Sequence, residues 1–283
     1  MRLAMMLTSL TLLSASSAGC GQGQANPAAA NDDRLSGSIQ LAGSSTIAPL
    51  AIELAKRFEG LYPQARVDVQ TGGSSRGIAD ARKGAVDLGM SSRALKDSEK
   101  EGLEQWEIAF DGVCFLVHRD NPVRELTREQ LKGIYCGEIT HWNQVGGNDA
   151  EIICINRADG RSELELVTKL WGIKPMDIEA DLIAGENQQG IKMVATDPNA
   201  ITYMSVGASE FEANAGTPIA LLPLDGIAAS VENVANGSFP LSRPLIFVTK
   251  PAVSKLAETF ISFARSKDVH DLVEEFSYVP IKD

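Results

Sequence analysis

Hydrophobic positions near the start of the chain change from one spacing to another across a short polar turn. Residues 36–41 alternate between polar and apolar side chains, which is typical of a strand with one buried face. From Ile47 to Phe58, apolar residues recur at i, i+3, i+4, i+7, i+8 and i+11, which predicts an amphipathic helix. Residues 43–46, Gly-Ser-Ser-Thr, link the two, and glycine allows a close backbone approach while serine and threonine favour helix N-caps.

The same order of strand, polar turn and helix occurs twice more. The strand, turn and helix cover 66–70, 71–77 and 78–83 in the second unit, and 151–156, 157–162 and 163–171 in the third. Each turn is rich in Gly, Ser, Thr or Arg. A single turn of this kind is most simply a capped helix. Because a helix N-terminus presents unpaired N–H groups and a partial positive charge, three such turns predict one oxyanion held by converging helix N-termini.

Strands and helices alternate along the rest of the chain, which predicts an α/β fold with parallel sheets. The apolar strand 110–118 leads to the turn signal Asn121-Pro122, where we expect a crossing into a second lobe. Residues 219–224 are predicted to cross back. The expected first lobe is therefore 35–118 plus 223–283, and the second is 119–222. Further helices are expected over 95–105, 126–131 (with Thr127 as N-cap and Gln130 completing a capping box), 190–196, 252–264 and 269–276.

The first 34 residues have the composition of a targeting segment and a tether. A positive residue and a short apolar core predict that residues 1–19 are a signal peptide, because the core is too short to span a membrane. Small residues before Cys20 are similar to a bacterial lipoprotein cleavage site, so Cys20 is expected to be lipidated. Ser17 departs from that pattern, and plain secretion is the alternative. Residues 20–34 are polar and rich in Ala, Gly and Pro, which predicts a flexible tether.

The net charge limits the classes of ligand that the chain can bind, and the number of cysteines limits their pairing in disulfides. The formal net charge of the 283 residues is −11, which argues against nucleic acid. The charge is compatible with binding an anion, because charges beyond roughly 10 Å are screened and local N–H groups and arginines set the potential of a site. Cys114 and Cys154 lie in apolar strand patterns, and with Cys136 they leave at least one cysteine unpaired. No metal-ligand spacing is present, and we expect neither a metal nor a cofactor.

Six segments after residue 35 share their order with one known family. They are GSSTIAPL (43–50), GGSSRG (72–77), DLGMSSR (87–93), GEITHW (137–142), NRADG (156–160) and DPNAITY (197–203). With these segments the chain resembles the phosphate-binding protein of the bacterial ABC-type phosphate importer. The resemblance implies a two-lobed fold of the type II periplasmic-binding-protein kind. Each lobe would be a mixed, mainly parallel sheet flanked by helices, and the ligand would lie in the cleft between them.

The same resemblance implies a function and a set of ligand residues. The protein would be an extracytoplasmic, monomeric lipoprotein that captures inorganic phosphate, delivers it to the membrane permease of an ABC transporter, and does no chemistry. Ser45 and Thr46 would supply N–H and hydroxyl donors, and Ser74 a second hydroxyl. Arg157 would bind phosphate with both arms of its planar guanidinium, and Asp159 would orient that arginine.

The chain departs from the family pattern at two places. Ser92 stands where many members have an aspartate that accepts a hydrogen bond from protonated phosphate. Arg161, Ser162 and Glu163 stand where many have Ser-Gly-Thr. Arg161 could add positive charge, and Glu163 could replace the missing acceptor or be a surface residue favoured by the helix dipole. We include all four in the predicted site, and a receptor or sensor for another oxyanion is the alternative function.

A serine hydrolase is the alternative from another class. Residues 73–77 match Gly-x-Ser-x-Gly between a strand and a helix, with Ser75 as the nucleophile. A hydrolase also needs a histidine and an acid, and the candidates are His118, His141 and His270. None of them lies in a late loop after a strand with an evident acidic partner, so the sequence favours a binding protein.

Overall fold

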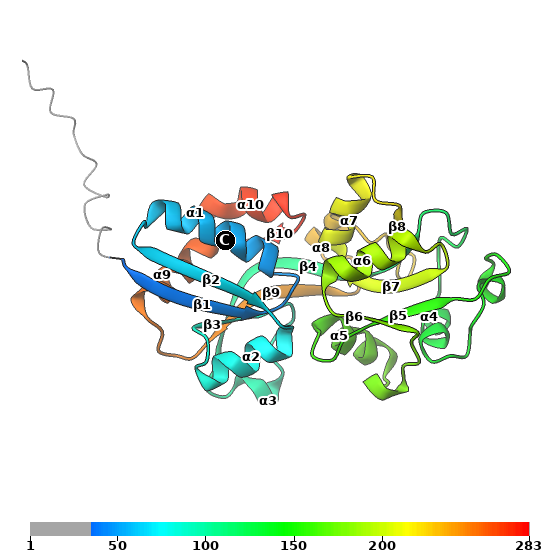
Figure 1. Cartoon of the computed structure of the whole chain (residues 1–283), viewed down its shortest axis with the longest axis horizontal. Coiled ribbons are helices and arrows are strands. Elements are labelled where there is room, and N and C mark those ends of the chain that lie inside the picture. Colours follow the sequence, from blue (N-terminus) through cyan, green and yellow to red (C-terminus); the bar gives the residue numbers. More distant parts are fainter. Residues whose placement is uncertain (1–34, 283) are drawn as a thin grey trace, which may run out of the picture.

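The computed structural model describes residues 35–282, which form two lobes side by side (Figure 1). The predicted signal peptide, the lipidated Cys20 and the tether lie outside the described residues. The first lobe holds the beginning and the end of the described chain, and the second holds its middle. This is the two-lobed α/β architecture that the sequence predicted.

Three parallel strands begin the first lobe. They are β1 (Gly37–Gly43), β2 (Ala65–Thr71) and β3 (Leu88–Ser91), in the order β2-β1-β3. β9 (Ser242–Thr249) adds antiparallel to β3, and β4 (Glu104–His118) antiparallel to β9. The helices of this lobe are α1 (Ala48–Leu61), α2 (Ser74–Lys83), the short α3 (Asp97–Lys100), α9 (Lys255–Ala264) and α10 (His270–Glu275), and β10 (Val279–Pro280) pairs with β4.

The second lobe is built on the far half of β4. β7 (Ala200–Ser205) and β8 (Ile219–Leu222) pair antiparallel with it, β5 (Ile153–Arg157) lies parallel to β7, and β6 (Leu182–Ala184) lies parallel to β5. Its helices are α4 (Arg128–Tyr135), α5 (Ser162–Trp171), α6 (Asn187–Thr196), α7 (Val206–Asn214) and α8 (Val231–Ala235), with 3-10 turns at Trp142–Val145 and Pro175–Asp177. Both sheets are mixed rather than mainly parallel, because β9 runs antiparallel to β3 and β4 in the first lobe and β4 runs antiparallel to β7 and β8 in the second.

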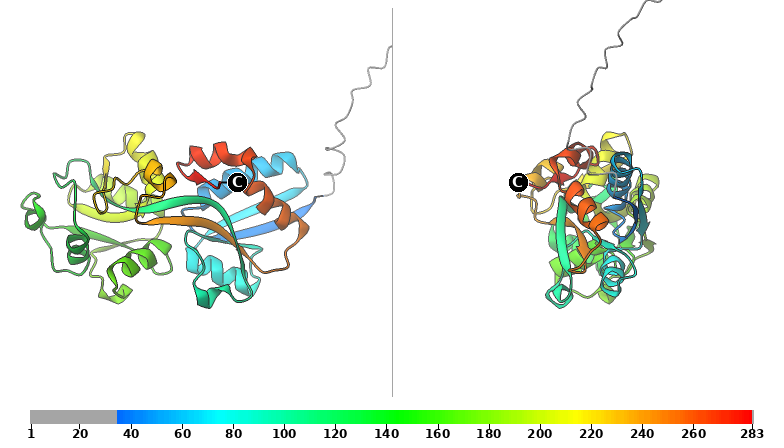
Figure 2. Two further views of the ribbon diagram at one scale, coloured as in Figure 1. Left: turned by 180° about the vertical axis from the view of Figure 1, so that it is seen from behind. Right: turned by 90° about the vertical axis from the view of Figure 1, so that its left-hand side faces the viewer.

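The crossing between the lobes differs from the predicted one. One large hydrophobic cluster includes Ala109 and Leu245, and the other begins at Val113 and extends to Leu241. The chain therefore passes between lobes near residues 110–112 and 242–244, and the predicted boundaries at 118/119 and 222/223 are corrected. No turn marks the crossing, because β4 is one unbroken strand that pairs first with β9 and then with β7. Figure 2 shows β4 and β9 running together from one lobe to the other.

Most local predictions are confirmed, and the exceptions have physical causes. Thr127 caps α4 and Gln130 completes the capping box, as predicted. The expected helix over 95–105 is wrong beyond one short turn, because the helix ends at Lys100 and β4 already begins at Glu104. α7 and α8 were not predicted. α7 carries almost no amphipathic pattern, and α8 is only five residues long.

Three further observations bear on the predicted class. Within residues 35–282, no helix combines the length and apolar character needed to cross a membrane. Cys114, Cys136 and Cys154 are free, and the first and last are buried.

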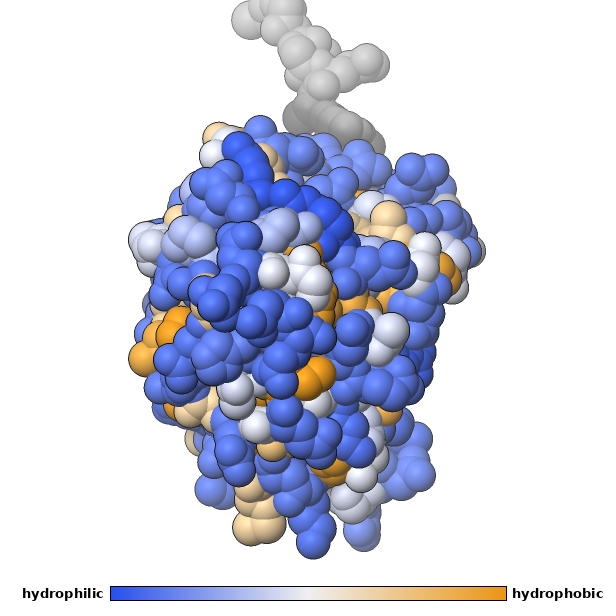
Figure 3. All heavy atoms as spheres, turned by 90° about the vertical axis from the view of Figure 1, so that its right-hand side faces the viewer, coloured by the Kyte–Doolittle hydropathy of each residue, from blue (hydrophilic) through white to orange (hydrophobic). Residues whose placement is uncertain are grey.

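The end face of the second lobe is mostly hydrophilic, with apolar residues in small separate spots (Figure 3). This face therefore shows no contiguous apolar patch (Figure 3).

Candidate anion-binding site

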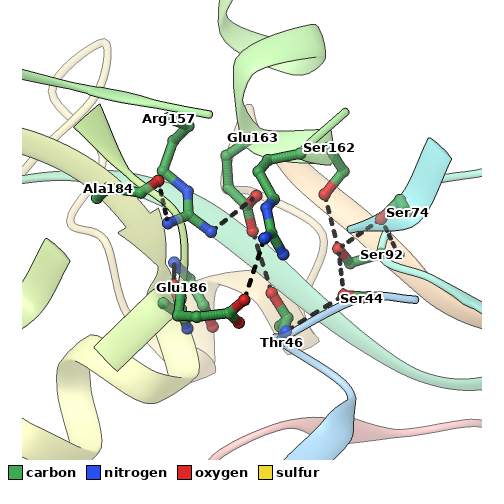
Figure 4. A network of polar contacts seen from close by, with 12 residues as sticks. Ser44, Thr46, Ser74, Ser92, Arg157, Ser162, Glu163, Ala184 and Glu186 are labelled. Carbon is green, nitrogen blue, oxygen red and sulfur yellow. Dashed lines mark hydrogen bonds and ion pairs between the residues drawn. The ribbon is translucent and has the colours of Figure 1, made fainter. Parts of the chain in front are cut away.

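The three polar turns of the sequence converge where the lobes meet. Ser44 precedes α1, Ser74 begins α2, Ser92 follows β3, and Ser162 begins α5 in the other lobe. The Ser92 hydroxyl lies at the centre: it is 2.9 Å from Ser44 Oγ, 3.4 Å from Ser74 Oγ and 2.6 Å from Ser162 Oγ. All four side chains belong to buried residues. We call this hydroxyl cluster, together with Thr46, Arg157, Glu163 and Arg243 beside it, the cup. Figure 4 shows the hydroxyl cluster with Thr46, Arg157 and Glu163.

Two glycines let the turns come this close. Gly43 has φ +139°, and a Cβ atom there would lie 2.2 Å from the carbonyl oxygen of Met90, so only glycine allows the first turn to pack against β3. Gly73 has φ +91°, and its Cβ would lie 2.8 Å from Gly160 O in the other lobe. The N–H of Ser75 donates to that same Gly160 oxygen at 3.1 Å, so the second and third turns touch across the cleft.

Arg157 ends β5 and supplies a buried cation. Its side chain is 0% exposed, its Nη1 donates to Ala184 O at 3.1 Å, and its Nη2 lies 3.6 Å from Glu163 Oε2. Its Nε and Nη2 make no hydrogen bond with any residue that the structure describes. Burial lowers the pKa of Arg157, against the attraction of Glu163. Two donors of a desolvated cation thus remain for an anion.

Glu163 places its carboxylate inside the cup. Its Oε1 accepts from Thr46 Oγ1 at 3.0 Å and from Arg243 Nη1 at 2.9 Å, while Oε2 faces Arg157. Burial disfavours the ionised form, but the charges of Arg243 and Arg157 outweigh it and lower the pKa of Glu163 to about 2. The carboxylate is therefore ionised at neutral pH.

Arg243, near the start of β9, is a site residue that the sequence analysis missed. It is 2% exposed and also donates to Ser162 Oγ at 2.9 Å and Ser92 Oγ at 3.3 Å. Asp111 on β4 holds it, with Oδ2 2.9 Å from Nη2. Burial alone would lower the pKa of Arg243, but Glu163 and Asp111 raise it above its ordinary value. The signal that the sequence offered for this residue was a single arginine near the start of an apolar strand.

The structure brings six of the predicted residues into the cup and leaves three outside it. Those inside are Thr46, Ser74, Ser92, Arg157, Ser162 and Glu163. Ser45 lines the adjacent cavity, and it is the Ser44 hydroxyl that accepts from the Thr46 N–H at 3.2 Å. Arg161 pairs with Glu186 at 3.0 Å, with its Nε and Nη1 unpartnered among the described residues. Asp159 is exposed and pairs with no described residue, so the role of orienting Arg157 is corrected: Glu163 faces that arginine instead.

A cavity of about 360 Å³ opens beside the cup, between the lobes. Ser45 and Thr46 line it from the first lobe, and Glu186 and Asn187 from the start of α6. Thr46 is therefore shared by the cavity and the cup.

The surroundings of Ser75 do not resemble a hydrolase site. Its hydroxyl donates to Glu165 Oε1 at 2.6 Å, and that carboxylate also pairs with Arg93 at 2.9 Å. His118 Nδ1 accepts from the N–H of Asp120, and His141 Nδ1 lies against Thr140. Ser75 thus has an acidic partner but no histidine base in any contact of the described residues. Residues 35–282 also contain no cluster of His, Cys, Asp and Glu that could hold a metal ion.

A two-lobed α/β receptor with an anion-type cup between its lobes is a periplasmic-binding-protein architecture, and the model of the PBP superfamily domain matches residues 27–268. A structure from Clostridium perfringens, described as a phosphate ABC transporter substrate-binding protein with bound phosphate, has 32% identity and a TM-score of 0.80 over 87% of this chain and 100% of that one. The chain belongs to this superfamily and, within it, to the substrate-binding proteins of phosphate ABC transporters.

Other relatives support the same family. The Bacillus subtilis phosphate-binding protein PstS is 28% identical over 99% of this chain and 94% of its own length. An ABC-type phosphate transport receptor from Vibrio cholerae has 29% identity and a TM-score of 0.68, over 87% of this chain and all of that one. This family consists of substrate-binding proteins rather than enzymes, which confirms that prediction.

Proposed function

We propose that the protein captures inorganic phosphate in the cup and delivers it to the membrane permease of an ABC transporter. The observation that carries the proposal is Arg157, a fully buried cation whose Nε and Nη2 have no hydrogen-bond partner among the described residues. Buried polar groups are normally satisfied, so donors left open beside a ring of hydroxyls favour an oxyanion as the missing partner. The named functions of the relatives support the same ligand.

The proposed ligand set follows from the contacts. Arg157 would bind two phosphate oxygens, and the hydroxyls of Thr46, Ser74, Ser92 and Ser162 would donate to the others. Because α1, α2 and α5 begin at or close to these residues, their N-terminal N–H groups would add to the positive potential. Since the groups come from both lobes, phosphate would hold the lobes together.

Calorimetry on purified, ligand-stripped protein tests the ligand. Phosphate, arsenate, sulfate and molybdate are titrated separately at one ionic strength. We expect stoichiometric binding of one phosphate per chain and weaker binding of sulfate. If phosphate gives no binding and another oxyanion does, the protein is a receptor for that anion instead.

We further propose that the mature protein is an extracytoplasmic, monomeric lipoprotein. The support is the sequence pattern of residues 1–19, the cysteine at position 20 and the polar tether that follows. Cys20→Ala should move the protein from the membrane fraction to the soluble extracytoplasmic fraction, with Cys136→Ala as the matched control. Light scattering of the protein without its first 34 residues should give the mass of one chain.

A further inference from the structure

The charged donors of the cup already face an anion that belongs to the chain. In Figure 4 the Glu163 carboxylate lies between Thr46 in one lobe and Arg157 in the other. Glu163 is 2% exposed, and Arg243 completes its contacts at 2.9 Å. With Asp111 beside Arg243, two buried carboxylates balance two buried guanidinium groups before any ligand binds.

Local structure explains why this carboxylate stays there. Glu163 is the second residue of α5, where the helix dipole favours a negative charge. Its side chain turns into the cleft rather than toward solvent, and it uses the Thr46 hydroxyl and the two guanidinium groups that an oxyanion would need.

The carboxylate satisfies the cup only in part. Arg157 Nε and Nη2 remain without hydrogen bonds among the described residues, because the nearest Glu163 oxygen is 3.6 Å away. Phosphate and the carboxylate would compete, because the carboxylate already uses the Thr46 hydroxyl and faces the two guanidinium groups that the ligand needs. Where no proton is shared between them, burying two such anions together is strongly unfavourable.

We propose that Glu163 is a tethered competitor for the cup and sets the affinity for the ligand, which binds by displacing the carboxylate from Thr46, Arg157 and Arg243. The proposal rests on the proposed function, because it takes phosphate as the incoming anion. A receptor whose binding-competent form is populated only a fraction of the time shows an apparent affinity reduced by that fraction. Occupation of the cup by Glu163 for nine-tenths of the time would raise the apparent Kd roughly tenfold.

The same contact makes Glu163 a bridge between the lobes in the absence of ligand. Thr46 precedes α1 in the first lobe, and Glu163 lies in α5 of the second. The ligand-free protein should therefore be compact, and removing the carboxylate should let the lobes separate until phosphate replaces it.

The test compares wild type with Glu163→Gln by phosphate calorimetry. The control is Glu129→Gln, because Glu129 is the second residue of α4 in the same lobe and is exposed, so that variant removes the same charge from a matched helix position. We expect Glu163→Gln to bind phosphate roughly tenfold more tightly or better, and Glu129→Gln to equal wild type. Glu163→Thr serves as a second variant if glutamine impairs folding.

Solution scattering gives an independent readout. We expect ligand-free Glu163→Gln to have a larger radius of gyration than ligand-free wild type, and to contract to the wild-type value with phosphate. If wild type binds phosphate and both Glu163 variants bind it equally or more weakly, the inference is overturned and the proposed function stands. If none of the proteins binds phosphate, the proposed function fails and the inference falls with it.

Discussion

Replacing Arg157 with alanine should weaken phosphate binding by roughly two to four orders of magnitude. The structure leaves two nitrogen donors of this buried side chain, Nε and Nη2, without hydrogen bonds among the described residues. A hydrogen bond to a charged group contributes about 1.5–3 kcal/mol, so two of them contribute about 3–6 kcal/mol. At about 1.4 kcal/mol per tenfold, this corresponds to a loss of roughly 10² to 10⁴ in affinity.

The assay is phosphate calorimetry, with two comparison variants. Arg157→Lys keeps the charge but loses the planar pair of donors, so its affinity should lie between those of wild type and Arg157→Ala. Arg128→Ala removes a half-exposed arginine of the same lobe that pairs with Asp225, and it should leave the affinity unchanged. Binding by Arg157→Ala within a few-fold of wild type would refute the assignment of Arg157 as the main charged ligand.

Three other outcomes follow from buried groups. Asp111→Asn should lower the free energy of unfolding by about 3 kcal/mol, because it removes one carboxylate partner of buried Arg243, and an unchanged urea midpoint would contradict this. The folded-state pKa of Glu163 is about 2, below its ordinary value of 4.5, so its ionised form stabilises the fold above that value and the stabilisation is lost as pH falls toward 2. The difference in unfolding free energy between wild type and Glu163→Gln should shrink over that pH window, and a constant difference would refute the assignment. Among the cysteines of the described residues, Cys136 should react first with a thiol reagent in the folded protein, because the other two are buried, and earlier labelling of a second thiol would count against this.

Local pattern was enough to predict the elements that carry the site. The spacing of apolar residues predicted α1, and the Gly-Ser-Ser-Thr turn before it contributes Ser44 and Thr46 to the cup. Such features depend on neighbours within one turn of helix or one strand, so they can be read along the chain. The same holds for the capping box at Thr127, whose partners are three residues apart.

Only the tertiary structure decided which charges meet. Arg243 and Glu163 are eighty residues apart in the chain, yet their side chains are 2.9 Å apart because β9 and α5 meet at the crossing between lobes. Asp159 and Glu163 were both plausible partners for Arg157 from their positions. The turn after β5 leaves Asp159 exposed, whereas the first turn of α5 directs Glu163 into the cup.

The lobe crossing shows the same limit. A turn such as Asn121-Pro122 is visible in the sequence, but a strand that continues through two sheets carries no local mark of the change. The sequence by itself determined the α/β units and the chemistry of their turns, because both depend on short-range spacing. The tertiary structure decided where the lobes divide and that a carboxylate of the chain lies among the donors meant for an anion, because both depend on contacts between residues distant in the chain.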